Sequence, residues 1–308
     1  MSDAKKPQAA VQTTGHAWDG DIQEYNNPLP SWWLWSFYAT VVFAVVYWIF
    51  YPAWPVGSSY TKGIMNNITY IDSDGTEKTT AWNTRALLMK DLQEGKAATL
   101  SREYLEKVKD ADYQTILGDA EMMAFTRSMA VGLFGDNCTP CHGAGGSGVM
   151  GLFPNLADDD WLWGGTVKDI ETTIADGRYG FMPSFSGTFN EKQLDDVSSY
   201  VLSLSGYKMQ AASVTRGKDI FQTNVGGCYY CHGTDGKGMK SQGSANLTDQ
   251  IWTIADVPDA GTADAQIAAV KHVIVNGVQR KMPHWSDRLD STQIKLLTVY
   301  VHELGGGQ

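Results

Sequence analysis

The sequence predicts a mainly α-helical protein, with one N-terminal transmembrane helix followed by two related helical domains. Three observations carry this prediction: an uncharged apolar block over residues 31–54, an internal repeat over residues 115–308, and two C-x-x-C-H motifs at equivalent places in that repeat. A chain of 308 residues has room for about two domains plus smaller segments.

The composition excludes several classes of protein. Hydrophobic residues make up 43% and charged residues 19%, which is the balance of a folded chain rather than a disordered one. The net charge of -10 argues against nucleic acid as a partner, because phosphate binding needs clustered Lys and Arg. Four cysteines are too few to hold 308 residues together as a disulfide framework.

The apolar block over residues 31–54 contains 24 residues and no charge. As a helix it would span about 36 Å, which exceeds the roughly 30 Å of a bilayer hydrocarbon core. Tryptophan rings stand at both ends, as expected where side chains meet lipid headgroups. A cleaved signal peptide fits poorly, because the block begins far from the N-terminus and no A-x-A site follows it.

The block therefore predicts an uncleaved membrane anchor, which the aromatic ends favour over a buried globular helix. Residues 1–30 form an N-terminal arm, and residues 55–114 form a polar, partly helical connector. The few lysines flanking the anchor lean weakly toward a cytoplasmic N-terminus.

The internal repeat divides the remaining chain into two domains, expected at residues 115–210 and 211–308. Ile174, Gly177 and the Met182-Pro183 pair recur one hundred positions later. The apolar positions of a terminal helix recur at the same offset, at helical spacing. These positions are Leu194, Val197, Tyr200, Val201 and Leu204, repeated as Ile294, Leu297, Tyr300, Val301 and Leu304.

The two C-x-x-C-H motifs carry the chemistry. The first is Cys138-Thr-Pro-Cys141-His142 and the second is Cys228-Tyr-Tyr-Cys231-His232. This spacing is typical of c-type haem attachment, in which two thiols form thioethers with the porphyrin vinyl groups and the adjacent His binds the iron. A redox dithiol or a zinc site would explain one motif, but two motifs at equivalent places in a repeat favour two covalently attached haem c groups.

The second axial ligand of each haem should come from a loop on the opposite haem face. Met182 and Met282 each precede a proline and lie before the terminal helix of their repeat. The simplest assignment pairs His142 with Met182 and His232 with Met282, although an exchange of the two Met loops between domains stays open. Arg178, Arg280 and Lys281 flank these loops, where they would either pair with haem propionates or form a solvated face.

Both repeats resemble the class I cytochrome c fold. Each has an N-terminal helix with a small residue and an aromatic residue, Ala130 and Phe134 in the first repeat and Gly217 and Phe221 in the second. The haem motif, the Met loop and a helix with a tyrosine then follow in order. The resemblance implies that the first and last helices of each domain cross at the small residue.

A narrower resemblance spans the whole chain. The arm from His16 to Pro30, the Trp32-Trp33 pair, and the stretch from Pro154 to Gly165 resemble the CcoP or FixP family, the dihaem subunit of cbb3-type cytochrome c oxidases. The resemblance implies electron transfer from a soluble donor cytochrome c, through a monohaem cytochrome c subunit, to a catalytic haem b and copper subunit that reduces O₂ to water and pumps protons. The chain would not be catalytic alone.

Haem attachment of this kind takes place outside the bacterial cytoplasm. The haem domains are therefore expected in the periplasm, behind a single-pass anchor in the inner membrane with a cytoplasmic N-terminus. Two alternatives stay open at this point: a free-standing membrane-tethered electron shuttle, and a dihaem peroxidase, which would need one haem with an open or displaceable ligand.

The charge is unevenly divided between the repeats. Residues 115–210 hold 12 acidic and 5 basic residues, a net charge of -7, whereas residues 211–308 hold 9 of each. Asp158, Asp159 and Asp160 form a short acidic run that we expect to face solvent. This division predicts that a basic donor cytochrome docks on the first haem domain.

Overall fold

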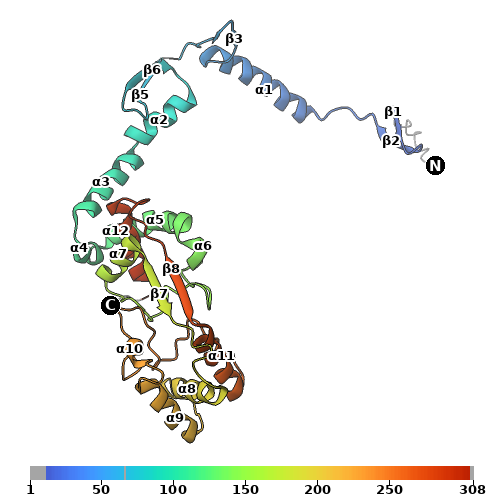
Figure 1. The fold of residues 1–308 in the computed structure, drawn as a ribbon. Helices are drawn as coiled ribbons and strands as arrows, with labels where there is room; N and C mark the ends of the chain where they lie inside the picture. Colours follow the sequence, from blue (N-terminus) through green and yellow to red (C-terminus); the bar gives the residue numbers. More distant parts are fainter. Residues whose placement is uncertain (1–11, 66, 306–308) are drawn as a thin grey trace, which may run out of the picture. The chain divides into compact units, whose positions relative to one another are not determined.

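The structure is a computed structural model that describes residues 12–65 and 67–305. It divides into two compact units, Met1–Ser101 and Arg102–Gln308. The first unit carries the apolar helix, and the second carries both C-x-x-C-H motifs (Figure 1).

The first unit is built around α1, Ser31–Phe50, none of whose side chains is buried. Among the described residues this is the one helix long and apolar enough to cross a membrane. It is four residues shorter than the predicted block, because Pro52 disfavours helical geometry at Tyr51, whose φ of -119° and ψ of 158° are extended. Its 20 residues span about 30 Å, the thickness of a bilayer core.

Short hairpins flank this helix. Among the described residues of the first unit, three antiparallel strand pairs and the helix α2 accompany α1, and α3 continues into the second unit. Their bounds are β1 Thr13–Trp18 with β2 Ile22–Tyr25, β3 Pro55–Val56 with β4 Ser59–Tyr60, β5 Asn67–Ile71 with β6 Glu77–Ala81, then α2 Thr84–Glu94 and α3 Lys96–Asp110. The connector is thus partly helical, as expected, but begins with two hairpins that its mixed composition did not reveal.

The second unit contains the elements that position the two motifs. In chain order they are α4 Tyr113–Gly118, α5 Ala120–Asn137, α6 Thr139–His142, α7 Val167–Asp176, β7 Arg178–Met182, α8 Glu191–Leu204, α9 Ala211–Gln222, α10 Tyr229–His232, α11 Ala263–Asn276, β8 Val278–Met282 and α12 Ser291–Leu304. The C-x-x-C-H motifs form the one-turn helices α6 and α10, and the Met-Pro pairs lie where β7 and β8 end.

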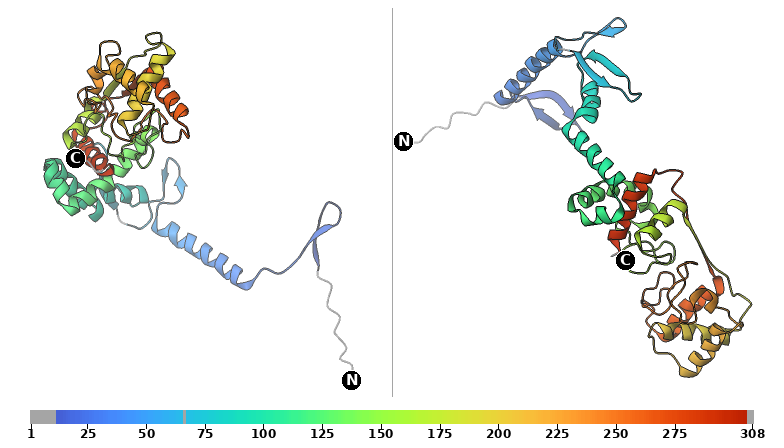
Figure 2. Two further views of the ribbon diagram at one scale, coloured as in Figure 1. Left: turned by 90° about the horizontal axis from the view of Figure 1, so that it is seen from below. Right: turned by 90° about the vertical axis from the view of Figure 1, so that its left-hand side faces the viewer.

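The terminal helices of the two repeats are exchanged. The last helix of the first repeat, α8, packs on α9 and α11, and the last helix of the chain, α12, packs on α5 and α7 (Figures 1 and 2). We therefore define a first module, formed by α5–α7 and α12, and a second module, formed by α8–α11. The expected domain boundary at residue 210 separates the two sequence repeats. The packed modules divide the chain differently, because the second module runs from α8 to α11 and the first combines α5–α7 with α12.

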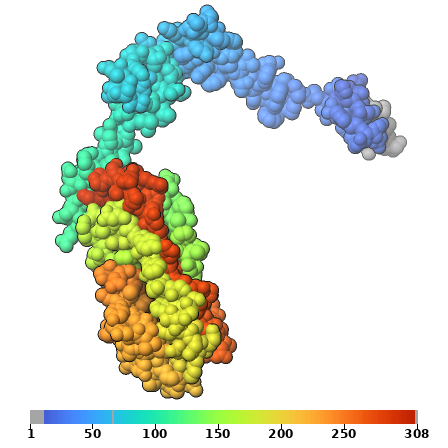
Figure 3. Space-filling model, viewed as in Figure 1, coloured from blue at the N-terminus to red at the C-terminus, as the bar shows by residue number. Residues whose placement is uncertain are grey.

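The chain crosses between the modules along one antiparallel ribbon. β7 leaves the first module after α7, and β8 returns from the second module after α11. Arg178 pairs with Met282, Gly180 with Arg280, and Met182 with Val278. Because the strands are antiparallel, each one delivers its Met-Pro pair to the module from which the other strand came. In the space-filling view the red C-terminal segment accordingly lies against green and yellow-green parts of the first module (Figure 3).

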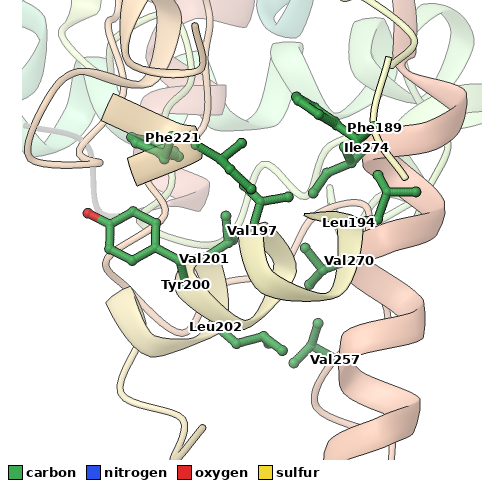
Figure 4. Packing of buried hydrophobic residues seen from close by; sticks show 12 residues of the cluster. Phe189, Leu194, Val197, Tyr200, Val201, Leu202, Phe221, Val257, Val270 and Ile274 are labelled. Atoms are coloured by element: carbon green, nitrogen blue, oxygen red, sulfur yellow. The ribbon is translucent and has the colours of Figure 1, made fainter. Parts of the chain in front are cut away.

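The core of the second module joins residues from both repeats. Val197, Val201 and Leu202 of α8 pack with Phe221 of α9 and with Val270 and Ile274 of α11 (Figure 4). The carboxylate of Asp196 on α8, 5% exposed, accepts two hydrogen bonds of 2.7 Å from Arg216 on α9. This ion pair holds the pKa of Asp196 below its ordinary value, mainly through the hydrogen bond from Arg216.

The core of the first module also joins residues from both repeats. Phe134 of α5 and Ile170 and Ile174 of α7 pack with Ile294, Leu297 and Val301 of α12. The small residue Ala130 is fully buried against Leu296 and Val299 of α12. The helices of each module therefore cross near the small residue, as the fold resemblance implied, but the crossing partner comes from the other repeat.

Residues 102–118 also belong to this core. Val108 and Ile116 are fully buried with Ala130, Leu296 and Val299. The Lys295 ammonium on α12 donates to the carbonyl oxygens of Lys109 and Ala111 at 2.6 and 2.8 Å, at the C-terminal end of α3. A cation there satisfies carbonyls that have no helical partner and suits the helix dipole.

The crossing of α8 and α9 gives a test of the exchange. A Cβ atom on Gly217 of α9 would lie 2.0 Å from the Asp196 carbonyl oxygen and 2.7 Å from Tyr200 Cβ, both on α8. We predict that Gly217→Ala lowers the free energy of unfolding by about 1–3 kcal/mol, since backbone atoms must move apart.

Gly132→Ala is the matched control. Gly132 lies within α5, and a Cβ atom added to it would have nothing within 4 Å, so alanine there should stabilise the helix by up to about 1 kcal/mol. Denaturant unfolding of both variants checks the pair. Equal stability changes at the two positions would contradict the α8–α9 packing.

Candidate haem sites

Each C-x-x-C-H motif presents its histidine in the same way. In the first module His142 Nδ1 lies 3.0 Å from the Pro154 carbonyl oxygen, and in the second His232 Nδ1 lies 3.0 Å from the Ala245 carbonyl oxygen. Because a carbonyl oxygen only accepts, Nδ1 must carry the proton. Nε2 is then left with a free lone pair, as in a metal-binding imidazole.

Burial sets the protonation state of these groups. It lowers the pKa of both His142 and His232, which keeps the rings neutral and able to bind a metal. It also raises the pKa of the Cys138 and Cys228 thiols to about 11. All four cysteines are free thiols, available for thioether formation. In the part of the chain that the structure describes, no three His, Cys, Asp or Glu side chains are grouped to hold an ion such as zinc.

The exchange decides which methionine accompanies which histidine. Met282 packs against the first-module core together with Cys138 and Phe134. Met182 packs against the second-module core together with Cys228 and Phe221. In the structure each methionine therefore packs beside the cysteine motif of the other repeat, which favours the exchanged alternative over the simplest sequence assignment.

Reciprocal backbone contacts hold the two Met loops in place. Trp285 N–H donates to the Ile174 carbonyl at 3.1 Å in the first module, and Phe185 N–H donates to the Ile274 carbonyl at 3.1 Å in the second. Gly177, with φ of 71°, lies so close to the Met282 carbonyl that a Cβ atom there would be 2.5 Å away. A Cβ atom added to Gly277 would likewise lie 2.6 Å from the Met182 carbonyl oxygen.

All eight predicted site residues line one continuous cavity of about 550 Å³, to which both modules contribute. Its walls include both histidines, both methionines and the four cysteines, with apolar side chains such as Phe134, Ile174 and Phe221 between them. An imidazole and a thioether in each half of an apolar cavity form the donor set of a six-coordinate haem c, so the residues present fit two such groups.

The cavity also contains side chains that the motifs alone did not identify. Trp161, Trp163 and Trp252 line it, as do Asp160 and Asp249. Trp161 and Trp252 occupy equivalent places after the two motifs, so the repeat itself carried a signal for them. The loops that hold these residues meet between the modules, where Gly151 N–H donates to the Thr253 carbonyl at 3.1 Å.

The acidic run at residues 158–160 does not face solvent as a whole, contrary to expectation. Asp159 is exposed, whereas Asp158 and Asp160 are half-buried. Burial, with the nearby carboxylates of Asp249 and Asp158, raises the pKa of Asp160 from 3.8 to about 6. Because the unfolded chain ionises this carboxyl first, Asp160 lowers the stability of the fold as pH rises from about 4 through about 6.

These observations define the chain as a protein with tandem cytochrome c domains carried behind an apolar N-terminal helix. Two family models match it. Residues 10–58 match the N-terminal domain of cytochrome oxidase-cbb3, FixP, and residues 129–201 and 212–301 each match cytochrome c oxidase, cbb3-type, subunit III.

Full-length relatives agree with these matches. The chain is 42% identical to the cbb3-type cytochrome c oxidase subunit FixP of Azorhizobium caulinodans, covering 96% of this chain and 94% of that one. It is 36% identical to subunit CcoP of Cereibacter sphaeroides, covering 96% and 95%. It is 41% identical to FixP of Bradyrhizobium sp. ORS 278, covering 97% of each. The chain belongs to the FixP/CcoP family of cbb3-type cytochrome c oxidase subunits.

The exchange makes a sharp prediction about ligation. In a variant with Cys228→Ala and Cys231→Ala, only the first motif can attach haem covalently. Met282→His in this background should lower the midpoint potential of the remaining haem and remove its sulfur-to-iron charge-transfer band, because thioether ligation raises the potential. Met182→His should change neither property.

The reciprocal background, with Cys138→Ala and Cys141→Ala, is the matched control. There Met182→His should change the potential and the band, and Met282→His should not. Spectroelectrochemical titration measures both quantities. If each methionine affects the haem attached to its own repeat, the exchanged ligation is wrong.

Proposed function

We propose that this chain is the dihaem electron-transfer subunit of a cbb3-type oxidase. It takes electrons from a soluble periplasmic donor cytochrome c and passes them to a monohaem cytochrome c subunit. The catalytic haem b and copper subunit then reduces O₂ to water and pumps protons. The observation that carries the proposal is the pair of His/Met donor sets, His142 with Met282 and His232 with Met182, in one cavity.

Haem c, when bound, supplies a reversible one-electron couple at each site. The protein's own residues attach and tune it. Cys138, Cys141, Cys228 and Cys231 would hold the two groups covalently, and the Pro154 and Ala245 carbonyls orient the two imidazoles. The apolar walls would keep water away from a bound haem, which would reduce the reorganisation that accompanies a change of its charge.

The donor sets favour electron transfer over catalysis by this chain. A peroxidase needs an iron with an open or displaceable ligand, whereas here a methionine packs into the same core as the first cysteine of each motif. The two sites share one cavity, so an electron can pass between them without leaving the second unit. We therefore assign the chain a carrier role, with O₂ chemistry in its partner subunit.

The apolar helix α1 supports a place at the inner membrane. It is long enough to cross a bilayer and buries none of its side chains, which suits contact with lipid or with other membrane helices. We propose that its N-terminal side is cytoplasmic and that both modules lie in the periplasm, where c-type haem is attached.

The charge division supports a docking site for the donor on the first module. The exchange leaves the division intact: residues 115–182 and 283–308 together hold 12 acidic and 5 basic residues, whereas residues 183–282 hold 9 of each. The first module is thus the acidic one in the structure too, even though α8 and α12 change places. An acidic surface steers a basic cytochrome and raises its association rate at low salt.

Association with oxidase subunits is the direct test of the proposed function. Affinity purification of the full-length chain in detergent should recover haem b, copper and further haem c, together with O₂ reduction by the purified material. A free-standing shuttle would purify with its own haem c alone. A chain lacking residues 1–55, exported by a cleavable signal, should retain two haem c groups and lose membrane attachment.

A charge-neutralisation series tests the docking site. Asp136, Asp159 and Asp176 are exposed residues of the first module, and Asp219, Asp256 and Asp259 are exposed residues of the second. Replacing the first three by Asn should slow bimolecular reduction by a basic cytochrome severalfold at low salt and flatten the salt dependence, because screening acts over about 10 Å at 0.1 M salt. The second triple variant should behave like the unmodified chain in stopped-flow experiments. Equal rates for both triple variants would contradict docking on the first module.

A further inference from the structure

Arg280 occupies the centre of the ribbon that joins the two modules. It pairs with Gly180, so a guanidinium stands on one strand where the other strand has no side chain. The Arg280 side chain lines the cavity, and its Nη2 donates to the Thr253 carbonyl at 3.2 Å. Its Nε and Nη1 atoms are buried and have no hydrogen-bond partner in the described chain.

A buried guanidinium without an anion is costly. Desolvation lowers the pKa of Arg280, and no charged group of the described chain offsets that effect. Moving a charge out of water without pairing it destabilises a fold by several kcal/mol, roughly. Two unsatisfied N–H groups that line a cofactor cavity therefore point to an anion supplied by the cofactor.

Arg178, on the opposite strand, shows what a satisfied arginine looks like in this ribbon. Its Nε donates to Thr173 Oγ1 at 2.9 Å, and its guanidinium lies 5.0 Å from the centre of the Trp163 ring. These partners belong to the first module. The Arg178 side chain is therefore stabilised by contacts within the protein. The Arg280 guanidinium, in contrast, donates one hydrogen bond to a backbone carbonyl, and two of its nitrogen atoms have no partner in the described chain.

Trp252 supplies a third donor in the same cavity. Its Nε1 atom is buried without a partner in the described chain, and the residue precedes Thr253, whose carbonyl accepts the hydrogen bond from Arg280. Trp252 packs against the second-module core. Its ring contacts the Tyr207 ring in an edge arrangement, with the ring centres 6.3 Å apart. The loop that bears it follows the Cys228–His232 motif, so these donors belong with the second haem site.

We infer that Arg280 and Trp252 bind the two propionate carboxylates of the haem at the Cys228–His232 motif, through Arg280 Nε and Nη1 and Trp252 Nε1. The inference rests on the proposed function, since it takes the second motif as a haem site. The Nε–H and the Nη1–H groups point to opposite sides of the planar guanidinium, so each can donate a charge-assisted hydrogen bond to a different carboxylate oxygen, and the indole N–H of Trp252 adds a third donor. Arg280 is a positioning residue, because it acts on the iron through the propionates.

This contact makes the two haem sites electrically unequal. A positive charge beside a haem favours the reduced state, because reduction removes a positive charge from the iron. The second haem gains a guanidinium from the ribbon, whereas the first lies in the module with a net charge of -7. Both effects raise the potential of the second haem relative to the first, so an electron on this subunit resides mainly on the second haem.

Redox titration of the full-length chain in detergent at pH 8, where carboxylates are ionised, tests the inference. Arg280→Gln should lower one of the two midpoint potentials and leave the other unchanged. Arg280→Lys should retain part of the difference, since it keeps the charge but not the separate Nε and Nη1 donors of the planar guanidinium. Trp252→Phe, which removes only the N–H, should lower the same potential by a smaller amount.

Two controls identify the charge and the haem. Lys237→Gln removes an exposed positive charge five residues after His232 and should move neither potential. The Met182→His substitution should lower the midpoint potential of the second haem and so identify it in the titration. Adding Arg280→Gln to this variant should lower that same potential further. A shift of the other potential would assign Arg280 to the first haem and overturn the inference.

The outcomes also separate this inference from the proposed function. If the unmodified chain shows two His/Met haems and Arg280→Gln and Trp252→Phe move neither potential, the propionate contact is wrong while the haem sites stand. If the unmodified chain binds no haem at the second motif, the proposed function itself fails. A poorly folded Arg280→Gln variant leaves Trp252→Phe and Arg280→Lys to decide, because both are conservative.

Discussion

The antiparallel pairing of β7 with β8 is the constraint on which the rest of the second unit depends. With Arg178 opposite Met282 and Met182 opposite Val278, each strand must end in the module that the other strand has just left. The terminal helices follow their strands, so α8 completes the second module and α12 completes the first. The second module becomes one continuous stretch of chain, inserted between α7 and α12 of the first.

This topology explains why two sites share one cavity. In a simple tandem each haem site would be closed by its own chain segment, and the link between the sites would be a flexible peptide. Here the ribbon carries both Met loops and Arg280 through the middle of the unit, and the loops after the two motifs meet at Gly151 and Thr253. Two exchanged helices and a shared ribbon connect the modules at several points, which restricts a change in the separation of the two C-x-x-C-H motifs.

The helix exchange leaves every local contact type unchanged. Gly217 meets Asp196 and Tyr200 of α8, and Ala130 meets Leu296 and Val299 of α12; each is a small residue against a terminal helix. Because the two terminal helices carry the same apolar pattern, either would fit either module roughly as well. Side chains that differ between the repeats then favour one pairing, such as Asp196 with Arg216 on α9 and Lys295 with the end of α3. The connecting ribbon of β7 and β8 favours the same pairing, because it carries each terminal helix into the other module.

The sequence by itself predicted the apolar helix, the two motifs, the helix order and the eight candidate site residues, because hydrophobic length, C-x-x-C-H spacing and repeat periodicity are local properties of the chain. It also showed the family, since the arm before Trp32 and the stretch after Pro154 are linear motifs. Only the tertiary structure decided that Met282 packs with Cys138, that Asp160 is half-buried, and that Arg280 has two buried nitrogen atoms without a hydrogen-bond partner in the described chain. These depend on which of two similar helices packs where, and a pattern that repeats in both halves carries no information about that choice.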